Sequence, residues 1–193
     1  MKLGIVVGSI REGRVTDRLA KWVESTAKSM EGVETKLIDL IDIPMPMFDE
    51  PISPQFNPDR HPEKNVKIWL DAVGECDAVA LVTPEYNRSY SSVLKNALDY
   101  LDFQLQRKPV MLVAHGSTGG AQAVSHLRAV IPGLVGVTDP IAVMVIGRVS
   151  EMIDETGKPS DEVKNNPYGP QASLNKSLEE LKWLSDALSK ARK

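Results

Sequence analysis

The sequence lacks several features that mark common classes of protein. It holds one cysteine, Cys76, which excludes an internal disulfide and any Cys-x-x-Cys metal or redox motif. No apolar run approaches the roughly 18 residues that a membrane-spanning helix requires. The formal net charge is −3 and no basic block stands out, so the charge pattern does not indicate nucleic-acid binding. These absences predict a cytoplasmic protein with no membrane or nucleic-acid partner, and we identify no metal site.

The N-terminus superficially resembles a secretion signal, because Lys2 precedes a short apolar run. That run covers only residues 3–7 and meets an arginine-rich turn without a small-residue cleavage site. We therefore interpret residues 3–7 as the first strand of the fold. The chain has 193 residues, of which 42% are hydrophobic and 25% are charged, so its size and composition suit one α/β domain.

The turn at residues 8–16 is the most informative stretch of the chain. It joins the first apolar run to a segment whose apolar residues recur at helical spacing as far as Met30. When a strand turns sharply into a helix, the N-terminal amides and dipole of that helix favour an anion in the turn. Gly8 and Gly13 allow the backbone of the turn to approach a ligand closely. Ser9 and Thr16 supply hydroxyls, and Arg11 and Arg14 supply positive charge. It therefore predicts a phosphate-binding cradle.

Two common phosphate-binding motifs do not fit this turn. Gly8 and Gly13 have the spacing of a P-loop, but Arg14 stands in place of the lysine and Val15 in place of the magnesium-binding hydroxyl. The dinucleotide fingerprint Gly-x-Gly-x-x-Gly is absent, because Ile10 stands where a glycine is needed. A monophosphate held by hydroxyls, amides and one or two arginines remains. The alternative is an ordinary tight turn with two solvated arginines.

Apolar runs alternate with helical stretches five times along the chain. We expect strands at 3–7, 33–40, 77–82, 109–114 and within 140–146. We expect helices that end near Met30, cover 63–75, begin at Ser91 or Ser92, run over 121–131 and cover 171–191. The alternation predicts an α/β fold, a doubly wound five-stranded parallel sheet with helices on both faces. We expect a single domain over residues 1–193, with a polar excursion at about 148–170.

Three unusual turns are expected at one edge of this sheet. Right-handed crossovers bring the carboxyl ends of the strands together, and ligands of such sheets bind there. The turns are 8–16, 83–90 and 115–120. The last has glycines at or before a helix start, where helix amides stabilise negative charge on a flat ring. A phosphate cradle beside such a slot suits flavin mononucleotide (FMN), whose reduced ring carries negative charge at its pyrimidine end.

The motifs of these turns resemble the NADPH-dependent FMN reductase family, which has a flavodoxin-like fold and includes quinone and azo-dye reductases. The matching stretches are Gly8-Ser9-x-Arg11, Thr83-Pro84-Glu85-Tyr86-Asn87-x-Ser89, Leu94-Lys95-Asn96-Ala97-Leu98-Asp99, and Gly119-Gly120 with Leu127-Arg128. The resemblance covers about residues 1–147. It implies an enzyme that holds FMN and uses NADPH or NADH as co-substrate.

The resemblance also implies which residues contact the cofactor. The phosphate would be held by Ser9, Arg11, Thr16 and Arg14. The isoalloxazine ring would be lined by Pro84, Glu85, Tyr86 and Asn87, and flanked at its other end by His115, Gly116, Ser117 and Gly119. Two positions depart from the family pattern: Arg14 stands where serine or asparagine is common, and Ser91-Ser92 where Pro-Gly is common.

The implied reaction has two half-reactions. NAD(P)H passes a hydride to the flavin and leaves, and a small acceptor such as a quinone, azo compound, metal oxyanion or free flavin then takes the electrons. Hydride transfer needs no protein acid or base, so we assign no catalytic residue. His115 is the titratable group best placed to donate a proton, and the alternative is that its ring only forms a wall of the site.

The sequence also bears on other functions and on the oligomeric state. A non-enzymatic flavodoxin-like electron carrier is the main alternative, although such carriers are usually strongly acidic and the net charge here is only −3. A hydrolase using Ser117 or Ser9 with His115 is disfavoured, since no Gly-x-Ser-x-Gly elbow is present. The family is usually dimeric or tetrameric, and Trp183 falls opposite the leucine stripe of the last helix. We expect a homodimer or homotetramer to which helices near the flavin edge and the 41–62 loop contribute.

Overall fold

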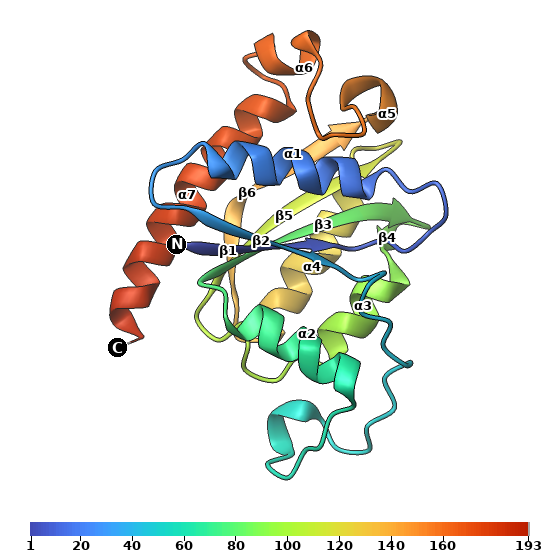
Figure 1. The fold of residues 1–193 in the computed structure, drawn as a ribbon, viewed down its shortest axis with the longest axis vertical. Coiled ribbons are helices and arrows are strands. Elements are labelled where there is room, and N and C mark those ends of the chain that lie inside the picture. Colours follow the sequence, from blue (N-terminus) through green and yellow to red (C-terminus); the bar gives the residue numbers. More distant parts are fainter. Residues whose placement is uncertain (193) are drawn as a thin grey trace.

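A parallel sheet forms the centre of the protein, whose computed structural model describes residues 1–192 (Figure 1). Its parallel strands are β1 (Lys2–Val7), β2 (Glu34–Asp39), β3 (Ala78–Tyr86), β5 (Pro109–Gly116) and β6 (Val137–Ile146). They lie in the order β2-β1-β3-β5-β6, so the strand order reverses between β1 and β3. The predicted doubly wound five-stranded sheet is therefore confirmed.

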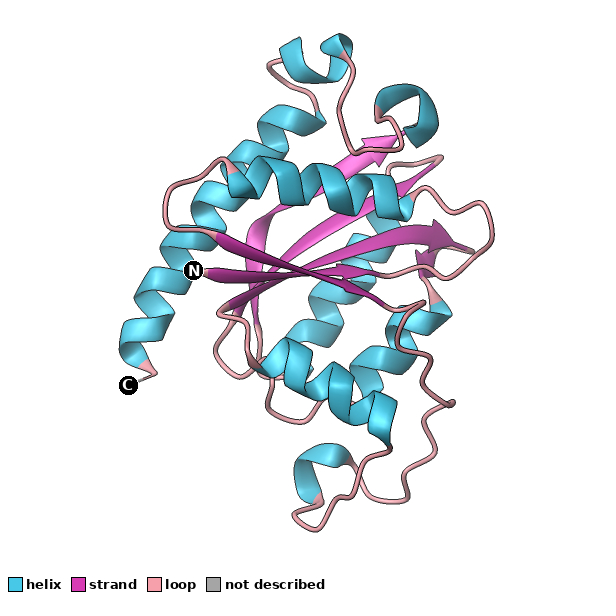
Figure 2. Ribbon diagram, in the orientation of Figure 1, coloured by secondary structure: helices cyan, strands magenta, loops and turns pink. Residues whose placement is uncertain are grey.

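Helices cover both faces of this sheet (Figure 2). One face is covered by α1 (Thr16–Lys28) and α7 (Pro170–Ala191), and the other by α2 (Lys64–Gly74), α3 (Ser92–Asp99) and α4 (Ala121–Gly133). Short elements complete the fold: η1 (Pro54–Phe56), β4 (Ser89–Tyr90), α5 (Val149–Met152) and α6 (Asp161–Asn165). No helix in the described part of the chain is both long and apolar enough to cross a membrane.

The apolar runs of the sequence form strands because both of their faces are buried. In β1, Leu3 and Ile5 pack into the core beneath α1 and α7, whereas Val6 packs into the core beneath α2, α3 and α4. Each core also holds a fully buried tryptophan whose indole N–H is satisfied. Trp22 donates to the side chain of Gln171 at 2.7 Å, and Trp69 donates to the carbonyl of Ala97 at 2.7 Å.

Some boundaries differ from those expected. β3 continues to Tyr86, four residues beyond its apolar run, because β4 pairs antiparallel with its end. β6 begins at Val137, and Pro140 is tolerated there because β6 is an edge strand with a register shift against β5. α4 includes Pro132 in its last turn and ends at Gly133. Ser91 is the N-cap of α3, one of the two residues expected, and accepts a bond from the Leu94 amide at 3.3 Å.

The proline-rich 41–62 loop is fixed to the body of the protein by Arg60. The guanidinium of Arg60 pairs with the carboxylate of Glu50 at 2.7 Å and with that of Asp102 at 3.5 Å. It also lies over the ring of Tyr100, 5.8 Å from the ring centroid. The long loop therefore packs as an ordered part of the fold.

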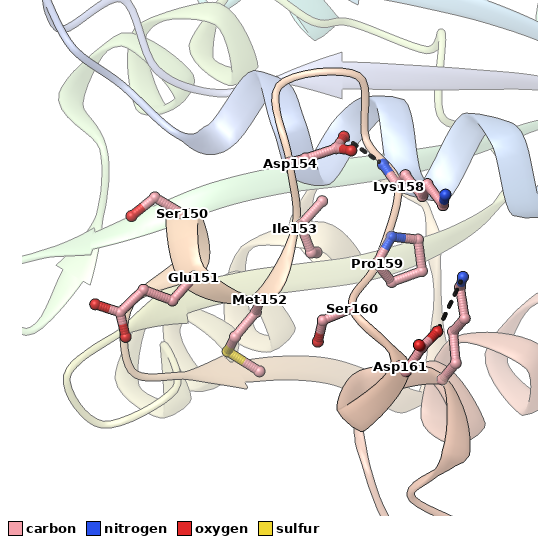
Figure 3. A pocket seen from close by; sticks show the side chains of 10 residues that line it. Ser150, Glu151, Met152, Ile153, Asp154, Lys158, Pro159, Ser160 and Asp161 are labelled. Carbon is pink, nitrogen blue, oxygen red and sulfur yellow. Dashed lines mark hydrogen bonds and ion pairs between the residues drawn. The ribbon is translucent and has the colours of Figure 1, made fainter.

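The segment after β6 folds over α1. Ile153 and Pro159 form an isolated bridge, and Gly157 at the tip of this hairpin lies directly on the α1 backbone, where an added Cβ would come within 2.7 Å of the Trp22 nitrogen. This segment encloses a cleft of about 320 Å³. Figure 3 shows the side chains that line it. Its lining residues all belong to residues 150–164, and none is a predicted site residue.

Candidate functional site

The three predicted turns meet at the carboxyl edge of the sheet and are joined by side-chain hydrogen bonds. The hydroxyls of Ser9 and Tyr86 are 3.2 Å apart, which joins the first turn to the second. Thr16 Oγ1 lies 2.9 Å from His115 Nε2, which joins the first turn to the third. Glu85 accepts a bond from Thr118 at 3.1 Å, which joins the second turn to the third. Residues far apart in the sequence are thus joined to one another at this edge of the sheet.

The first turn has the features of an anion site. The N-cap position of α1 is Val15, whose side chain makes no capping bond, so the first amides of α1 remain available to a ligand. The hydroxyl of Ser9 is buried beside them, and the Arg11 side chain is exposed at the rim. Gly8 allows β1 and β3 to approach closely, because an added Cβ would lie 2.8 Å from the Val82 carbonyl oxygen. These residues fit a phosphate group.

Arg14 occupies a different position from that expected of a direct phosphate ligand. Its guanidinium makes a bidentate pair with the carboxylate of Asp39, at 2.7 Å and 2.5 Å, and also donates to the carbonyl of Ser9. The two side chains of the pair are only 15% and 16% exposed. The hydrogen bond to Asp39 raises the pKa of Arg14 further above its ordinary value. Arg14 therefore fastens the cradle to the end of β2.

His115 is buried at the end of β5 and is joined to the first turn. Burial lowers the pKa of its imidazole from 6.5 to about 4, so the ring is neutral at physiological pH. Its Nε2 is also engaged by Thr16, which is itself buried. A neutral, hydrogen-bonded ring is a poor proton donor, which favours the alternative reading of this residue as a wall.

The second turn has a strained backbone. Asn87 and Arg88 have φ values of 47° and 71°, in the left-handed region that few residues other than glycine adopt. The strain is held by the β3–β4 pairing of Tyr86 with Ser89. Beside this turn lies a surface cleft of about 520 Å³, lined by Tyr86, Asn87, Ser89, Tyr90, Ser92 and Lys95. Strained turns beside a cleft are typical of ligand sites.

The glycines of the third turn are required by its geometry. Gly119 and Gly120 both have positive φ values, and a Cβ on Gly120 would lie 2.9 Å from the backbone nitrogen of His115. Gly116 accepts a bond from the Gly119 amide at 3.0 Å, which closes the turn. Ser117 is exposed at its tip. The turn thus presents backbone and small side chains to the edge of the sheet, which allows a flat ring to approach.

Several residues that organise the site were missed in the sequence. Asp39 is the last residue of β2 and lies beside the end of β1. Its position at the end of a predicted strand is the only feature of the sequence that places it near the site. The Ser91 hydroxyl donates to the carbonyl of Gly8 in addition to capping α3. Thr118 and the amide of Gln122 both bind Glu85. Among residues 1–192 no group of three or more metal-ligating side chains is found.

Comparison with known proteins finds NAD(P)H-dependent FMN reductases and related flavoenzymes. A family model described as NADPH-dependent FMN reductase matches residues 1–149. An NAD(P)H-dependent FMN reductase of Schizosaccharomyces pombe is 30% identical over 181 residues, covering 94% of this chain and 85% of that protein. An FMN-dependent NADPH-azoreductase of Staphylococcus aureus is 32% identical over 145 residues, covering 72% and 74%. The flavoenzyme NAD(P)H:(acceptor) oxidoreductase FerB of Paracoccus denitrificans has a TM-score of 0.73 at 24% identity, covering 94% and 97%.

Proposed function

The chain belongs to the NADPH-dependent FMN reductase family and is an FMN-dependent NAD(P)H oxidoreductase, and we propose that it holds FMN in one site built from the three joined turns. The observation that carries this proposal is the set of hydrogen bonds that bring residues 8–16, 83–90 and 115–120 together at the carboxyl edge. That edge is where doubly wound sheets bind their ligands.

The first turn would hold the phosphate. Ser9 and Arg11 would contact it directly. The first backbone N–H groups of α1, which begins at Thr16 and has no side-chain cap, would also contact it. Arg14 would act through the cradle, because its guanidinium is already shared between Asp39 and the Ser9 carbonyl. Charge-assisted hydrogen bonds contribute about 1.5–3 kcal/mol each, so a few of them hold a phosphate without a metal.

The other two turns would bind the isoalloxazine ring. The residues proposed to line it are Pro84, Glu85, Tyr86 and Asn87 on one side and His115, Gly116, Ser117 and Gly119 on the other. When bound, FMN supplies the chemistry: it accepts a hydride from NAD(P)H and gives electrons to an acceptor. The chain's own residues would position the ring, and the lowered pKa of His115 makes this residue a poor source of a proton.

The acceptor would be a small molecule. The cleft beside Tyr86 and Asn87 is large enough for a nicotinamide or a ring of similar size, and Lys95 on its wall supplies positive charge. We propose a quinone, an azo compound or free flavin as the acceptor class, in cytoplasm whose reducing conditions suit the single cysteine. We further propose that residues 1–193 act as one domain, since the tail shares a core with α1.

The proposed assembly is a homodimer or homotetramer. Met47 and Phe56 of the 41–62 loop are 76% and 78% exposed, and the Gln55 side chain donates to the Asp102 carbonyl beside the exposed Phe103. Trp183 on α7, predicted to be exposed, is 64% exposed. Apolar surface of this kind favours association. Sedimentation equilibrium at micromolar concentration tests this; a monomer throughout would contradict it.

An anaerobic absorption spectrum tests the proposed function. The purified protein is mixed with FMN, freed of unbound flavin and titrated with NADPH or NADH, and a quinone is then added. We expect flavin bands that bleach with the nicotinamide and return with the quinone. Bound flavin that the nicotinamide cannot bleach would favour an electron carrier, and failure to take up FMN would overturn the proposed site.

A further inference from the structure

Glu85 makes a contact that direct binding of the ring does not require. One oxygen of its carboxylate accepts a hydrogen bond from Thr118 Oγ1 at 3.1 Å, and the other accepts from the backbone N–H of Gln122 at 3.0 Å. Gln122 is the second residue of α4. The second turn therefore provides a carboxylate cap for the helix that follows the third turn.

The Glu85 carboxylate takes the place of the side-chain cap that the N-cap residue of α4 does not supply. The N-cap residue of α4 is Gly120, which has no side chain and adopts a φ of 78°. A serine or aspartate there would fill the same role in most helices, but the close approach of Gly120 to the His115 nitrogen excludes a side chain. The two turns also pack tightly, since a Cβ on Gly116 would come within 3.1 Å of the Glu85 Cβ.

A carboxylate at this point changes the electrostatics of the edge. The free N-terminus of a helix carries a partial positive charge that stabilises a nearby anion. Here Glu85 occupies one of the first amides of α4 and sets a full negative charge against that partial positive one. The third turn therefore offers less stabilisation to a developing negative charge than its glycines alone would suggest.

We propose that Glu85 is a positioning residue with two effects: it fastens the second turn to the third, and its charge lowers the reduction potential of the flavin held between them. The inference rests on the proposed function, because it concerns the same site. A lower potential makes the flavin harder to reduce by NAD(P)H and makes its reduced form a stronger reductant toward the acceptor. Glu85 thereby favours electron transfer to the acceptor over reduction of the flavin by NAD(P)H.

Three substitutions and one control distinguish the effect of the hydrogen bonds of Glu85 from the effect of its charge. Glu85→Gln keeps the shape: its carbonyl oxygen can accept from the Gln122 amide and its amide can donate to the Thr118 hydroxyl, so only the charge is lost. Glu85→Ala removes both bonds and the charge. Thr118→Val removes one bond and leaves the charge. Glu162→Gln, which changes an exposed carboxylate on α6, is the matched control for loss of one negative charge outside the three turns.

The readouts are the midpoint potential of the bound flavin, from an anaerobic dye-equilibrated titration, and the Kd of oxidised FMN. For Glu85→Gln we expect reduced flavin to gain affinity relative to oxidised flavin by about tenfold, a potential rise of about 30 mV for a two-electron couple, with little change in the Kd of oxidised FMN. For Glu85→Ala we expect the same rise and a Kd weakened by about tenfold or more, the usual cost of one or two lost hydrogen bonds. Thr118→Val should weaken the Kd slightly, and Glu162→Gln should change neither quantity.

The outcomes distinguish this inference from the proposed function. Wild-type protein that binds FMN, together with a Glu85→Gln potential equal to that of wild type and of Glu162→Gln, would overturn the charge effect. A Glu85→Ala variant that keeps the wild-type Kd would overturn the tie. If wild-type protein takes up no FMN, the proposed function itself fails and the inference fails with it.

Discussion

Replacing Arg11 and Arg14 separately with alanine should have different consequences, although both arginines lie in the same turn. The Arg11 side chain is exposed, and the bonds that shape the turn around it run through its backbone, to Ser9 Oγ and from the Arg14 amide. Arg11→Ala should therefore leave the fold intact and remove positive charge from the phosphate cradle. Loss of one charge-assisted hydrogen bond costs about 1.5–3 kcal/mol, so the Kd of FMN should rise by about 10- to 150-fold.

Arg14→Ala should act first on the fold. It leaves the carboxylate of Asp39, 16% exposed, without its bidentate partner, and it also releases the carbonyl of Ser9. Breaking a fully buried pair costs 3–5 kcal/mol, and the partial exposure here reduces that to about 1–3 kcal/mol. The unfolding temperature of the flavin-free protein should fall by several degrees. FMN affinity should fall as well, because the cradle loses its attachment to β2.

Two assays distinguish these effects: quenching of FMN fluorescence measures the Kd, and thermal unfolding of the flavin-free protein measures stability. Lys190→Ala near the end of α7 is the control for loss of one positive charge elsewhere and should change neither. An Arg11→Ala protein with wild-type FMN affinity would refute the assignment of Arg11 to the phosphate. An Arg14→Ala protein as stable as wild type would refute the structural role of its pair with Asp39.

Three further predictions concern stability. The pKa of His115 is about 4 in the folded protein and 6.5 in the unfolded chain, so between these values the unfolded chain binds a proton that the native state does not. The free energy of unfolding should therefore fall by up to about 3 kcal/mol as the pH falls from 6.5 to 4. Urea titrations should show a smaller fall over this range for His115→Gln. Gly157→Ala should lower unfolding free energy by about 2–4 kcal/mol without changing the Kd of FMN, because φ is +85° and the new Cβ would meet the backbone of α1. Gly120→Ala should lower both stability and FMN affinity, measured by the same two assays, because the new Cβ would press on the His115 nitrogen in the third turn.

The sequence predicted the sheet well because its strands are buried on both faces. Runs such as residues 3–7 and 109–114 are apolar at nearly every position, so each strand can be recognised without knowing which strand lies next to it. The end of β3 was not predicted, because the turn that follows it lacks the usual sequence signal. Its hairpin turn uses Asn87 and Arg88 with positive φ, where the usual signal would be a glycine.

The location of the site could also be predicted, but the partners of its charged side chains could not. The topology places the three turns together whatever their side chains do. Whether Arg14 faces a ligand or Asp39, and whether Glu85 faces a ring or the start of α4, depends on contacts between segments distant in sequence. Local pattern carries no information about such pairings. The docking of Gly157 on α1 is of the same kind: the turn was visible in the sequence, but its contact was not.

Amide hydrogen exchange, with and without FMN, tests most directly whether the three turns form one cofactor site. Peptides from residues 8–16, 83–90 and 115–120 should all exchange more slowly when FMN is bound. A peptide covering residues 153–160, which contact α1 through Gly157 and lie outside the three turns, should exchange at the same rate in both states. Protection confined to one turn, or protection at 153–160 in place of the three turns, would contradict the proposed site.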